Sequence, residues 1–187
     1  MSTTESMQRP GYVVASLSAL MQSLGEERVS NMLSSFQSRT ESDTEAFLHE
    51  KAMVMERRDL SRTYVCFSSA DESVLGYVTI GIKCLTIPDN HTLPNRILKK
   101  MNIDSKSRVA QSYLIGQLSR SKDSPQGFGT ILMEVAIRQL EISKMYVGCR
   151  LVRLDCREEL IPYYQEYGFI PVIGNENAGL NQMLMVF

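Results

Sequence analysis

The sequence predicts a single α+β domain in which helices pack on a mixed, largely antiparallel sheet. Its 187 residues suit one compact core, and 43% apolar with 22% charged residues are ordinary globular values. Apolar residues recur at strand spacing in some stretches and at helical spacing in others. The second half runs strand, loop, helix, strand, helix, strand, an order that favours helices packed on a mixed sheet. Residues 1–10, which include a Ser/Thr-rich start, are expected to be weakly ordered.

The first third is predicted to contain an opening strand and two helices. The run that follows Gly11 is apolar and β-rich at first and then passes into a short helix. After Gly25, apolar residues at helical spacing predict a helix that reaches Phe36. A second helix is expected to begin near Thr40, with acidic residues in its first turn, and to end at the basic pair 57–58.

The middle third predicts a β-hairpin, a short helix and a strand. Strand-like runs at 62–68 and 74–87 are separated by a polar turn, which predicts the hairpin. A basic helical stretch, PNRILKKM, lies within 88–107, and a strong strand is expected over 108–118.

The last third predicts one long helix and a strand, helix, two-strand ending. After a loop of turn formers, the spacing of apolar residues over 129–147 predicts a long helix. RLVRLDC is expected to be a strand, and REELIPYYQEY a helix closed by Gly168. The segments FIPVI and NQMLMVF predict two further strands.

Composition narrows the class of protein. The 20 basic residues are offset by 21 acidic ones, so general binding to nucleic acid is not favoured. Four cysteines without a CxxC pair are expected to be buried free thiols, and with two histidines they do not predict a metal site. The first residues lack an apolar signal region and no stretch is long enough to span a bilayer, so a cytoplasmic protein without membrane contact is expected.

The turn Gly127-Phe128-Gly129 is the segment most indicative of function. A glycine turn that opens a helix presents backbone N–H groups and the positive end of the helix dipole, which suits a pyrophosphate. Many strand-to-helix turns contain two glycines for backbone geometry alone, so the turn needs support from its surroundings.

Three segments in order give the chain a resemblance to the GNAT superfamily of N-acetyltransferases, in particular to bacterial and phage GNAT-domain proteins. Ser124–Gly129 is similar to the CoA-binding signature Q/R-x-x-G-x-G/A, and the preceding strand YLIGQLSR to the strand that receives the pantetheine arm. PYYQEYGF, Pro162–Phe169, resembles the family's FYEKNGF helix end. The three segments span Ser112 to Phe169, about a third of the chain, and are specific in combination.

The resemblance implies a GNAT fold with a splayed central parallel strand pair, and acetyl-CoA as co-substrate. Where the signature begins with Gln or Arg, this chain has Ser124, so the phosphates are expected to be held mainly by N–H groups between Gln126 and Thr130. The residues implied to bind the co-substrate are Leu118, Ser119, Arg120, Ser124, Gln126, Gly127, Phe128, Gly129 and Thr130.

By the same resemblance Tyr164 is the expected catalytic residue, a phenol that protonates the departing CoA thiolate. Its alternative role is a half-buried aromatic wall. Tyr163 and Tyr167 form an i, i+4 pair expected to pack. Cys156 has no nearby His, so a direct ternary mechanism is preferred to an acyl-enzyme. The base that takes the proton from the amine stays open among Asp155, Glu158 and Glu159.

The acceptor is a primary amine that the sequence does not identify: a small molecule, a protein amine, or the α-amino group of aminoacyl-tRNA. Charged tRNA is the one nucleic acid left open, through a basic edge of Arg96, Lys99, Lys100, Lys106 and Arg108. A noncatalytic binding module with the same fold is the alternative from another class, and a homodimer is also left open.

Overall fold

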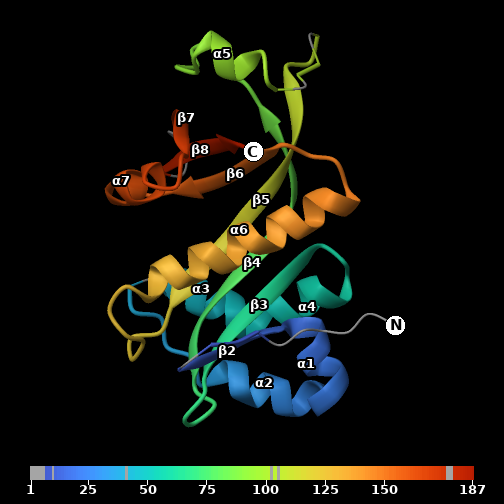
Figure 1. Ribbon diagram of the computed structural model, residues 1–187, viewed down its shortest axis with the longest axis vertical. Helices are drawn as coiled ribbons and strands as arrows, with labels where there is room; N and C mark the ends of the chain where they lie inside the picture. The colour runs from blue at the N-terminus through green and yellow to red at the C-terminus, as the bar shows by residue number, and fades with distance from the viewer. Residues whose placement is uncertain (1–6, 10, 41, 102, 105, 176–178) are drawn as a thin grey trace. The chain divides into compact units, whose positions relative to one another are not determined.

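Figure 1 shows the computed structural model of the protein, which describes residues 7–9, 11–40, 42–101, 103–104, 106–175 and 179–187. Most of the segment 1–10 therefore lies outside the described residues. The chain divides into two compact units, Met1–Ile80 with Gln117–Gln139, and Gly81–Gly116 with Leu140–Phe187. The expectation of a single domain stays a prediction.

The first unit contains the N-terminal helices and the strands beside them. Its elements are β1 (Met7–Arg9), β2 (Tyr12–Ser16), α1 (Leu17–Leu24), α2 (Glu26–Ser34), α3 (Ser42–Ala46), a π-helical turn (Phe47–Lys51), α4 (Ala52–Arg57), β3 (Ser61–Ser68), the first part of β4 (Val74–Thr86), the end of β5 (Val109–Arg120) and the first part of α6 (Phe128–Tyr146).

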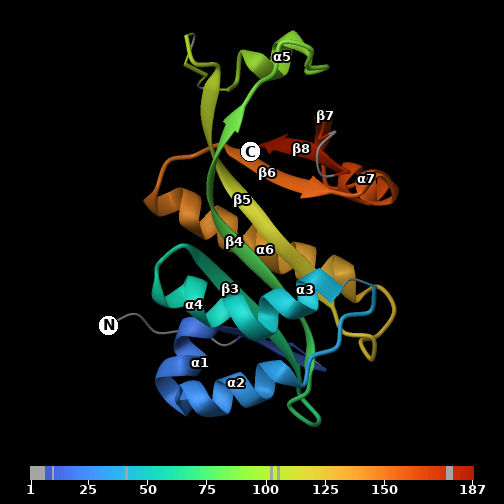
Figure 2. The ribbon, with the colours of Figure 1, turned by 180° about the vertical axis from the view of Figure 1, so that it is seen from behind.

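The strands of the first unit follow the order β1-β2-β3-β4-β5. β2 and β3 are antiparallel neighbours, with Tyr12 opposite Ser68 and Ser16 opposite Tyr64. Helices α1 to α4 cover one face of these strands, and the first part of α6 covers the other (Figures 1 and 2). The predicted opening strand, the two N-terminal helical segments and the hairpin are confirmed.

Local signals in the sequence explain where the first helices begin and end. Ser16 caps α1, because its hydroxyl oxygen accepts the N–H of Ala19 at 3.3 Å. Gly25 has φ +81°, a conformation that glycine adopts without strain, and it separates α1 from α2. The helical segment from Ser42 is interrupted by the π-helical turn, which the sequence did not indicate.

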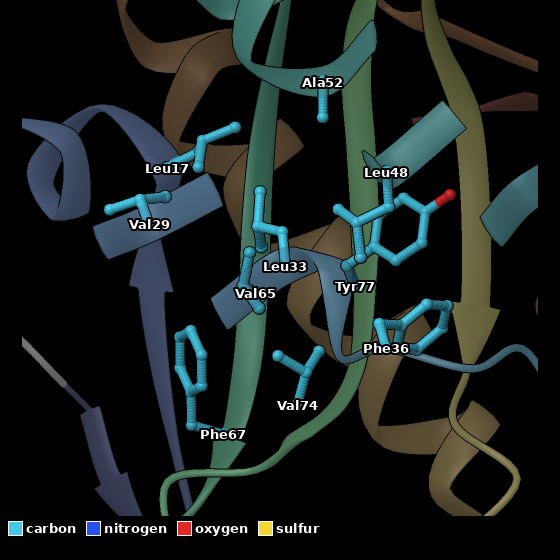
Figure 3. Close-up of a cluster of buried hydrophobic side chains, with 10 residues drawn as sticks. All are labelled: Leu17, Val29, Leu33, Phe36, Leu48, Ala52, Val65, Phe67, Val74 and Tyr77. Atoms are coloured by element: carbon cyan, nitrogen blue, oxygen red, sulfur yellow. The ribbon is translucent and has the colours of Figure 1, made fainter. Parts of the chain in front are cut away.

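The face under α1 to α4 carries the main core of the first unit (Figure 3). Leu17, Val29, Leu33 and Leu48 are at most 1% exposed and converge on β3 and β4. Tyr77 from β4 is also fully buried, and its hydroxyl donates to the backbone oxygen of a residue in α3 at 2.5 Å. Burial of this apolar face holds the helices on the sheet.

On the other face of the first unit, the start of α6 packs on β2, β3 and β4. Phe128 is 1% exposed and its ring meets that of Tyr12 edge-on, with centroids 5.7 Å apart. Leu132, Leu75 and Cys66 complete this cluster. The first turn of α6 is therefore fixed by its own core residues.

The second unit contains the rest of the chain. Its elements are the remainders of β4, β5 and α6, then α5 (Asn95–Leu98), β6 (Leu151–Cys156), a 3₁₀ turn (Glu158–Leu160), α7 (Ile161–Gln165), β7 (Ile170–Asn175) and β8 (Leu180–Val186).

The strands of the second unit follow the order β4-β5-β6-β8-β7. β5 and β6 are parallel, and their registered pairing joins Tyr113 to Val152 and Leu114 to Arg153. β6 instead pairs along its full length with antiparallel β8. The short parallel pairing beside long antiparallel ones is the mixed arrangement expected from the resemblance.

Two details differ from the sequence expectations. β5 continues to Arg120, two residues past its predicted end, because its last residues pair within the first unit. Cys84 is exposed and Cys149 is partly exposed, so the expectation of four buried thiols was wrong for these two. Ile82 and Cys84 are both exposed, as is Lys83 between them.

Candidate functional site

The candidate co-substrate site begins where β5 leads into α6. The loop after β5 is held by backbone bonds, since the N–H of Ser121 donates to Leu75 at 2.8 Å and that of Lys122 to Gln37 at 3.0 Å. Within the loop, the Ser124 hydroxyl donates to the backbone oxygen of Ser121 at 2.7 Å. These bonds fix the path of the chain toward the glycine turn.

The glycine turn itself opens helix α6. Gly127 has φ +81°, and no atom lies within 4 Å of where a Cβ would be, so backbone conformation rather than space favours glycine here. The N–H of Phe128 donates to Pro125 at 3.2 Å, and that of Thr130 to Gly127 at 3.0 Å. The N–H groups of Gly127 and Gly129 take no part in these two bonds. They lie at the positive end of a 19-residue helix, where an anion is stabilised.

Several residues expected to contact the co-substrate turn their side chains inward. Leu118 and Phe128 pack in the cluster under α6. Ser119 is 6% exposed, and its hydroxyl lies 3.0 Å from that of Ser38 and 2.9 Å from that of Thr44. No pattern in the sequence indicated this hydroxyl network. These positions can offer a ligand their backbone, but not these side chains.

Ser124 is also 6% exposed, and its hydroxyl is used within the loop. The serine that replaces the Gln or Arg of the family signature is thus a turn-forming residue. Gln126 is exposed beside the turn. The hydroxyl of Ser124, which was expected to contact the co-substrate, is thus already used within the loop, and the expectation that phosphates are met mainly by N–H groups between Gln126 and Thr130 stays a prediction.

Arg120 is the cation at the end of β5. Its backbone oxygen accepts the N–H of Arg39 at 3.1 Å, which holds the strand end in place. Its Nη1 is buried and has no hydrogen-bond partner among the described residues. A buried guanidinium nitrogen without an acceptor costs free energy, which an anionic ligand would recover.

Tyr164 lies in α7 of the second unit. It is 8% exposed, and its ring meets those of Tyr163 and Phe169 edge-on at centroid distances of 5.0 and 6.0 Å. Its backbone oxygen accepts the N–H of Phe169 at 3.2 Å, across a turn in which Gly168 has φ +87°. The predicted glycine at the helix end is confirmed, and it fixes the ring of Tyr164 in an aromatic cluster.

Tyr163 and Tyr167 pack together as their spacing predicts, with ring centroids 5.2 Å apart. The hydroxyl oxygen of Tyr163 is buried and has no hydrogen-bond partner of good geometry among the described residues. Burial, followed by the neighbouring Tyr167, raises the pKa of Tyr163. Tyr163 is therefore a neutral phenol at physiological pH.

The candidate bases occupy different environments in the second unit. Asp155 is half-buried, and its two carboxylate oxygens accept from Nη2 of Arg153 at 2.8 and 2.9 Å. Lys83 Nζ lies 3.9 Å from the same carboxylate. Glu158 and Glu159 are exposed in the 3₁₀ turn. Asp155 is thus the one of the three with a fixed orientation.

Cys156 is poorly suited to act as a nucleophile. It is 4% exposed, and burial raises the pKa of its thiol to about 11, with the charges of Asp155 and Glu159 adding to the effect. Since the thiolate is the reactive form, the preference for a direct mechanism gains support. Among the described residues, no three or more His, Cys, Asp or Glu side chains gather as metal ligands. In the same part of the chain, no helix is long and apolar enough to cross a bilayer.

Comparison with known proteins finds its matches among solved structures. No protein-family model and no curated protein matches the sequence. AtaT complexed with acetyl-methionyl-tRNAfMet is 21% identical, covers 94% of both chains and superposes with a TM-score of 0.71. A tyrosine-to-phenylalanine mutant of KacT is 20% identical, covers 92% of this chain and 94% of its own, and has a TM-score of 0.70.

A third structure, AtaTR bound with AcCoA, is 19% identical, covers 95% of this chain and 94% of its own, and has a TM-score of 0.65. At these identities the likeness shows the fold. AtaT and KacT have the GNAT fold, and the mixed sheet with one parallel pair and flanking helices matches it. The chain therefore has the GNAT fold that the three sequence segments predicted.

Proposed function

We propose that the protein is an N-acetyltransferase that moves the acetyl group of acetyl-CoA directly to a primary amine. The observation that carries the proposal is the turn at Gly127, which opens α6 with N–H groups directed out of the helix end. The unpartnered Nη1 of Arg120, at the end of the preceding strand, supplies a positive charge for the pyrophosphate. The structure of AtaTR bound with AcCoA supports the choice of co-substrate.

Acetyl-CoA should raise the melting temperature, because a ligand that binds only the native state stabilises it by mass action. At an acetyl-CoA concentration of about 100 times Kd, binding should raise the free energy of unfolding by roughly 2.7 kcal/mol. Gly129→Glu is the matched variant, since it places bulk and negative charge where the backbone must approach a pyrophosphate. We expect the variant to fold and to lose the shift. Absence of a shift for the parent protein at millimolar acetyl-CoA would count against the co-substrate.

In the proposed reaction the neutral amine attacks the thioester carbonyl carbon. The tetrahedral intermediate then collapses, the carbon–sulfur bond breaks, and the thiolate accepts a proton from the Tyr164 hydroxyl. The amine loses its proton to a base that stays open among Asp155, Glu158 and Glu159. AtaT and KacT have both been solved as tyrosine-to-phenylalanine mutants, which supports a test of a tyrosine in this protein.

Tyr164→Phe tests the acid role, because it keeps the ring and removes only the hydroxyl. Thiol release from acetyl-CoA should fall by about 10²-fold, the lower end of general acid contributions, with little change in acetyl-CoA affinity. Tyr163→Phe is the control and should release thiol like the parent. If both variants match the parent, the ring of Tyr164 is a wall of the site. A parent protein that binds acetyl-CoA but never releases thiol would favour the noncatalytic binding module.

We further propose that the acceptor is the α-amino group of aminoacyl-tRNA. It rests on the structural likeness to AtaT complexed with acetyl-methionyl-tRNAfMet. Four exposed cations of the second unit, Arg96, Lys99, Lys100 and Lys106, provide contacts for phosphates, whereas Arg108 is already paired with Asp89. The balance of basic and acidic residues concerns the whole chain, whereas this local cluster of cations can bind phosphates on one part of the surface.

A double variant, Lys99→Gln with Lys100→Gln, should weaken binding of charged tRNA and flatten its salt dependence, because each phosphate contact contributes to the slope. Lys51→Gln, an exposed lysine of the first unit, is the control. Equal losses in both variants would contradict the assignment. The substrate and co-substrate both imply a cytoplasmic protein. An AtaT mutant toxin bound to the C-terminus of the antitoxin AtaR suggests looking for a small antitoxin gene beside this one.

A further inference from the structure

A cavity of about 500 Å³ lies in the first unit, away from the elements that form the glycine turn. It is open to solvent and is lined by α1, the first residue of α2, the end of α4 and the start of β3. Its volume is in the range of small-molecule sites. Neither the proposed transfer reaction nor the candidate co-substrate site uses any of its residues.

Glu56, at the end of α4, is the most buried ionisable group of this cavity, at 5% exposed. One carboxylate oxygen, Oε2, accepts the backbone N–H of Thr63 at 2.9 Å. The other, Oε1, accepts no hydrogen bond among the described residues. Its nearest cationic atom is Nη1 of Arg62 at 3.6 Å, beyond hydrogen-bond range. A buried carboxylate oxygen without a donor is costly, and this one belongs to a residue that lines the hollow.

The other charges around the cavity are already paired with each other. Nη1 of Arg57 lies 3.1 Å from Glu26, and Arg62 pairs with Asp59. Because Arg62 also lies 3.6 Å from Glu56, the two guanidiniums of the lining are shared among three carboxylates, which leaves one excess negative charge. The ligand that complements the cavity carries a single positive charge and N–H donors.

Arg62 covers Glu56 but is held only loosely. Its side chain is 45% exposed, its partner Asp59 is 78% exposed, and Nη1 also donates to the backbone oxygen of Glu56 at 3.2 Å. Exposed pairs of this kind contribute little to stability, so the guanidinium can swing toward solvent at small cost. A compact ammonium group can then reach Oε1, which the planar guanidinium does not.

We propose that this cavity binds a free primary aliphatic amine in its ammonium form, with the cation on Glu56 and the carbon chain on Met21. Burial raises the pKa of Glu56, whereas the Ser18 hydroxyl hydrogen-bonds the Glu56 carboxyl and thereby lowers that pKa in part. The amide oxygen of Gln22 in the same lining can accept a further N–H group of the ligand.

The test is a titration of the ¹⁵N-labelled full-length protein with n-butylammonium chloride at pH 8, followed by NMR. Tetramethylammonium chloride, which carries the same charge and has no N–H donor, is the matched control. We expect saturable shifts at residues of the cavity, with Kd on the order of 1 mM, for n-butylammonium alone. Equal effects of the two salts, or no saturable binding, would overturn the proposal.

Two variants separate ligand binding from a purely structural role. Glu56→Gln keeps the shape and should weaken binding at least tenfold. Arg62→Met removes the competing cation and should strengthen binding several-fold, an effect that loss of structure cannot mimic. Unchanged affinity in Arg62→Met refutes the proposal even if Glu56→Gln fails to fold. Gly129→Glu should bind n-butylammonium like the parent, so failure here is distinct from failure of the acetyl-CoA assignment.

Discussion

Gly76→Ala is a small change in β4 that should disturb the strand leading into the glycine turn. A Cβ at this position would lie 2.8 Å from the backbone oxygen of Ser119, 2.9 Å from Cδ1 of Leu132 and 3.3 Å from Cα of Arg120. Leu132 can change its rotamer, but the Ser119 oxygen cannot retreat without moving β5. Overpacking of this kind typically costs about 1–3 kcal/mol. For a chain of this size, that corresponds to a fall in Tm of about 2–4 °C per kcal/mol.

Thermal unfolding followed by circular dichroism measures this cost, and Gly148→Ala is the control. No atom lies within 4 Å of a Cβ at position 148, so that variant should melt like the parent protein. Because the displaced atoms belong to Ser119 and Arg120, the Gly76→Ala protein should also show a smaller thermal shift with acetyl-CoA. A Gly76→Ala protein that melts within about 1 °C of the parent would refute the close-packing argument.

Three further predictions concern buried polar groups. Burial raises the pKa of Glu56, so the folded protein holds a proton that the unfolded chain releases, and the parent loses stability as pH rises through the raised pKa. The Tm difference between Glu56→Gln and the parent should therefore increase with pH. A difference that stays constant with pH would contradict this reasoning. Iodoacetamide at pH 8 should label exposed Cys84 well before Cys66, whose thiol pKa burial raises to about 12, as mass spectrometry of the native protein can show. Tyr163→Phe should leave the free energy of unfolding nearly unchanged or raise it, because the Tyr163 hydroxyl has no hydrogen-bond partner of good geometry among the described residues. Tyr77→Phe should lower the free energy of unfolding by about 1 kcal/mol, because a buried hydrogen bond is lost. Chemical denaturation measures both values, and a larger loss in Tyr163→Phe would contradict the argument.

Much of the fold could be predicted because its strongest signals are local. The long helix after Phe128, the hairpin around Ser68–Ser73 and the glycine at 168 each follow from spacing or turn chemistry within a few residues. The π-helical turn at 47–51 could not be predicted in this way. It depends on how the helix packs on β3 and β4, which the local sequence does not record.

The candidate site was less predictable at the level of side chains. The resemblance indicated which backbone would meet a phosphate, but the inward orientation of Ser119 depends on Ser38 and Thr44, which are far away in sequence. Cys84 was expected to be buried because its neighbours are apolar. In the structure it lies in a stretch of β4, Ile82–Cys84, that is exposed along its length, and an apolar segment alone does not say which parts of a strand are covered.

The pairing of β2 with β3 has a consequence for the order in which the protein forms during synthesis. These neighbours in the sheet are separated along the chain by the whole helical segment 17–60, so closing the pair requires a long loop to be ordered first. While the ribosome makes the helices, the edge of β2 that pairs with β3 has no strand beside it. This edge is covered only after Phe67 has left the exit tunnel and β3 can pair with it. Slow translation between 17 and 68 would thus prolong the period in which the nascent chain is open to aggregation or to chaperone binding.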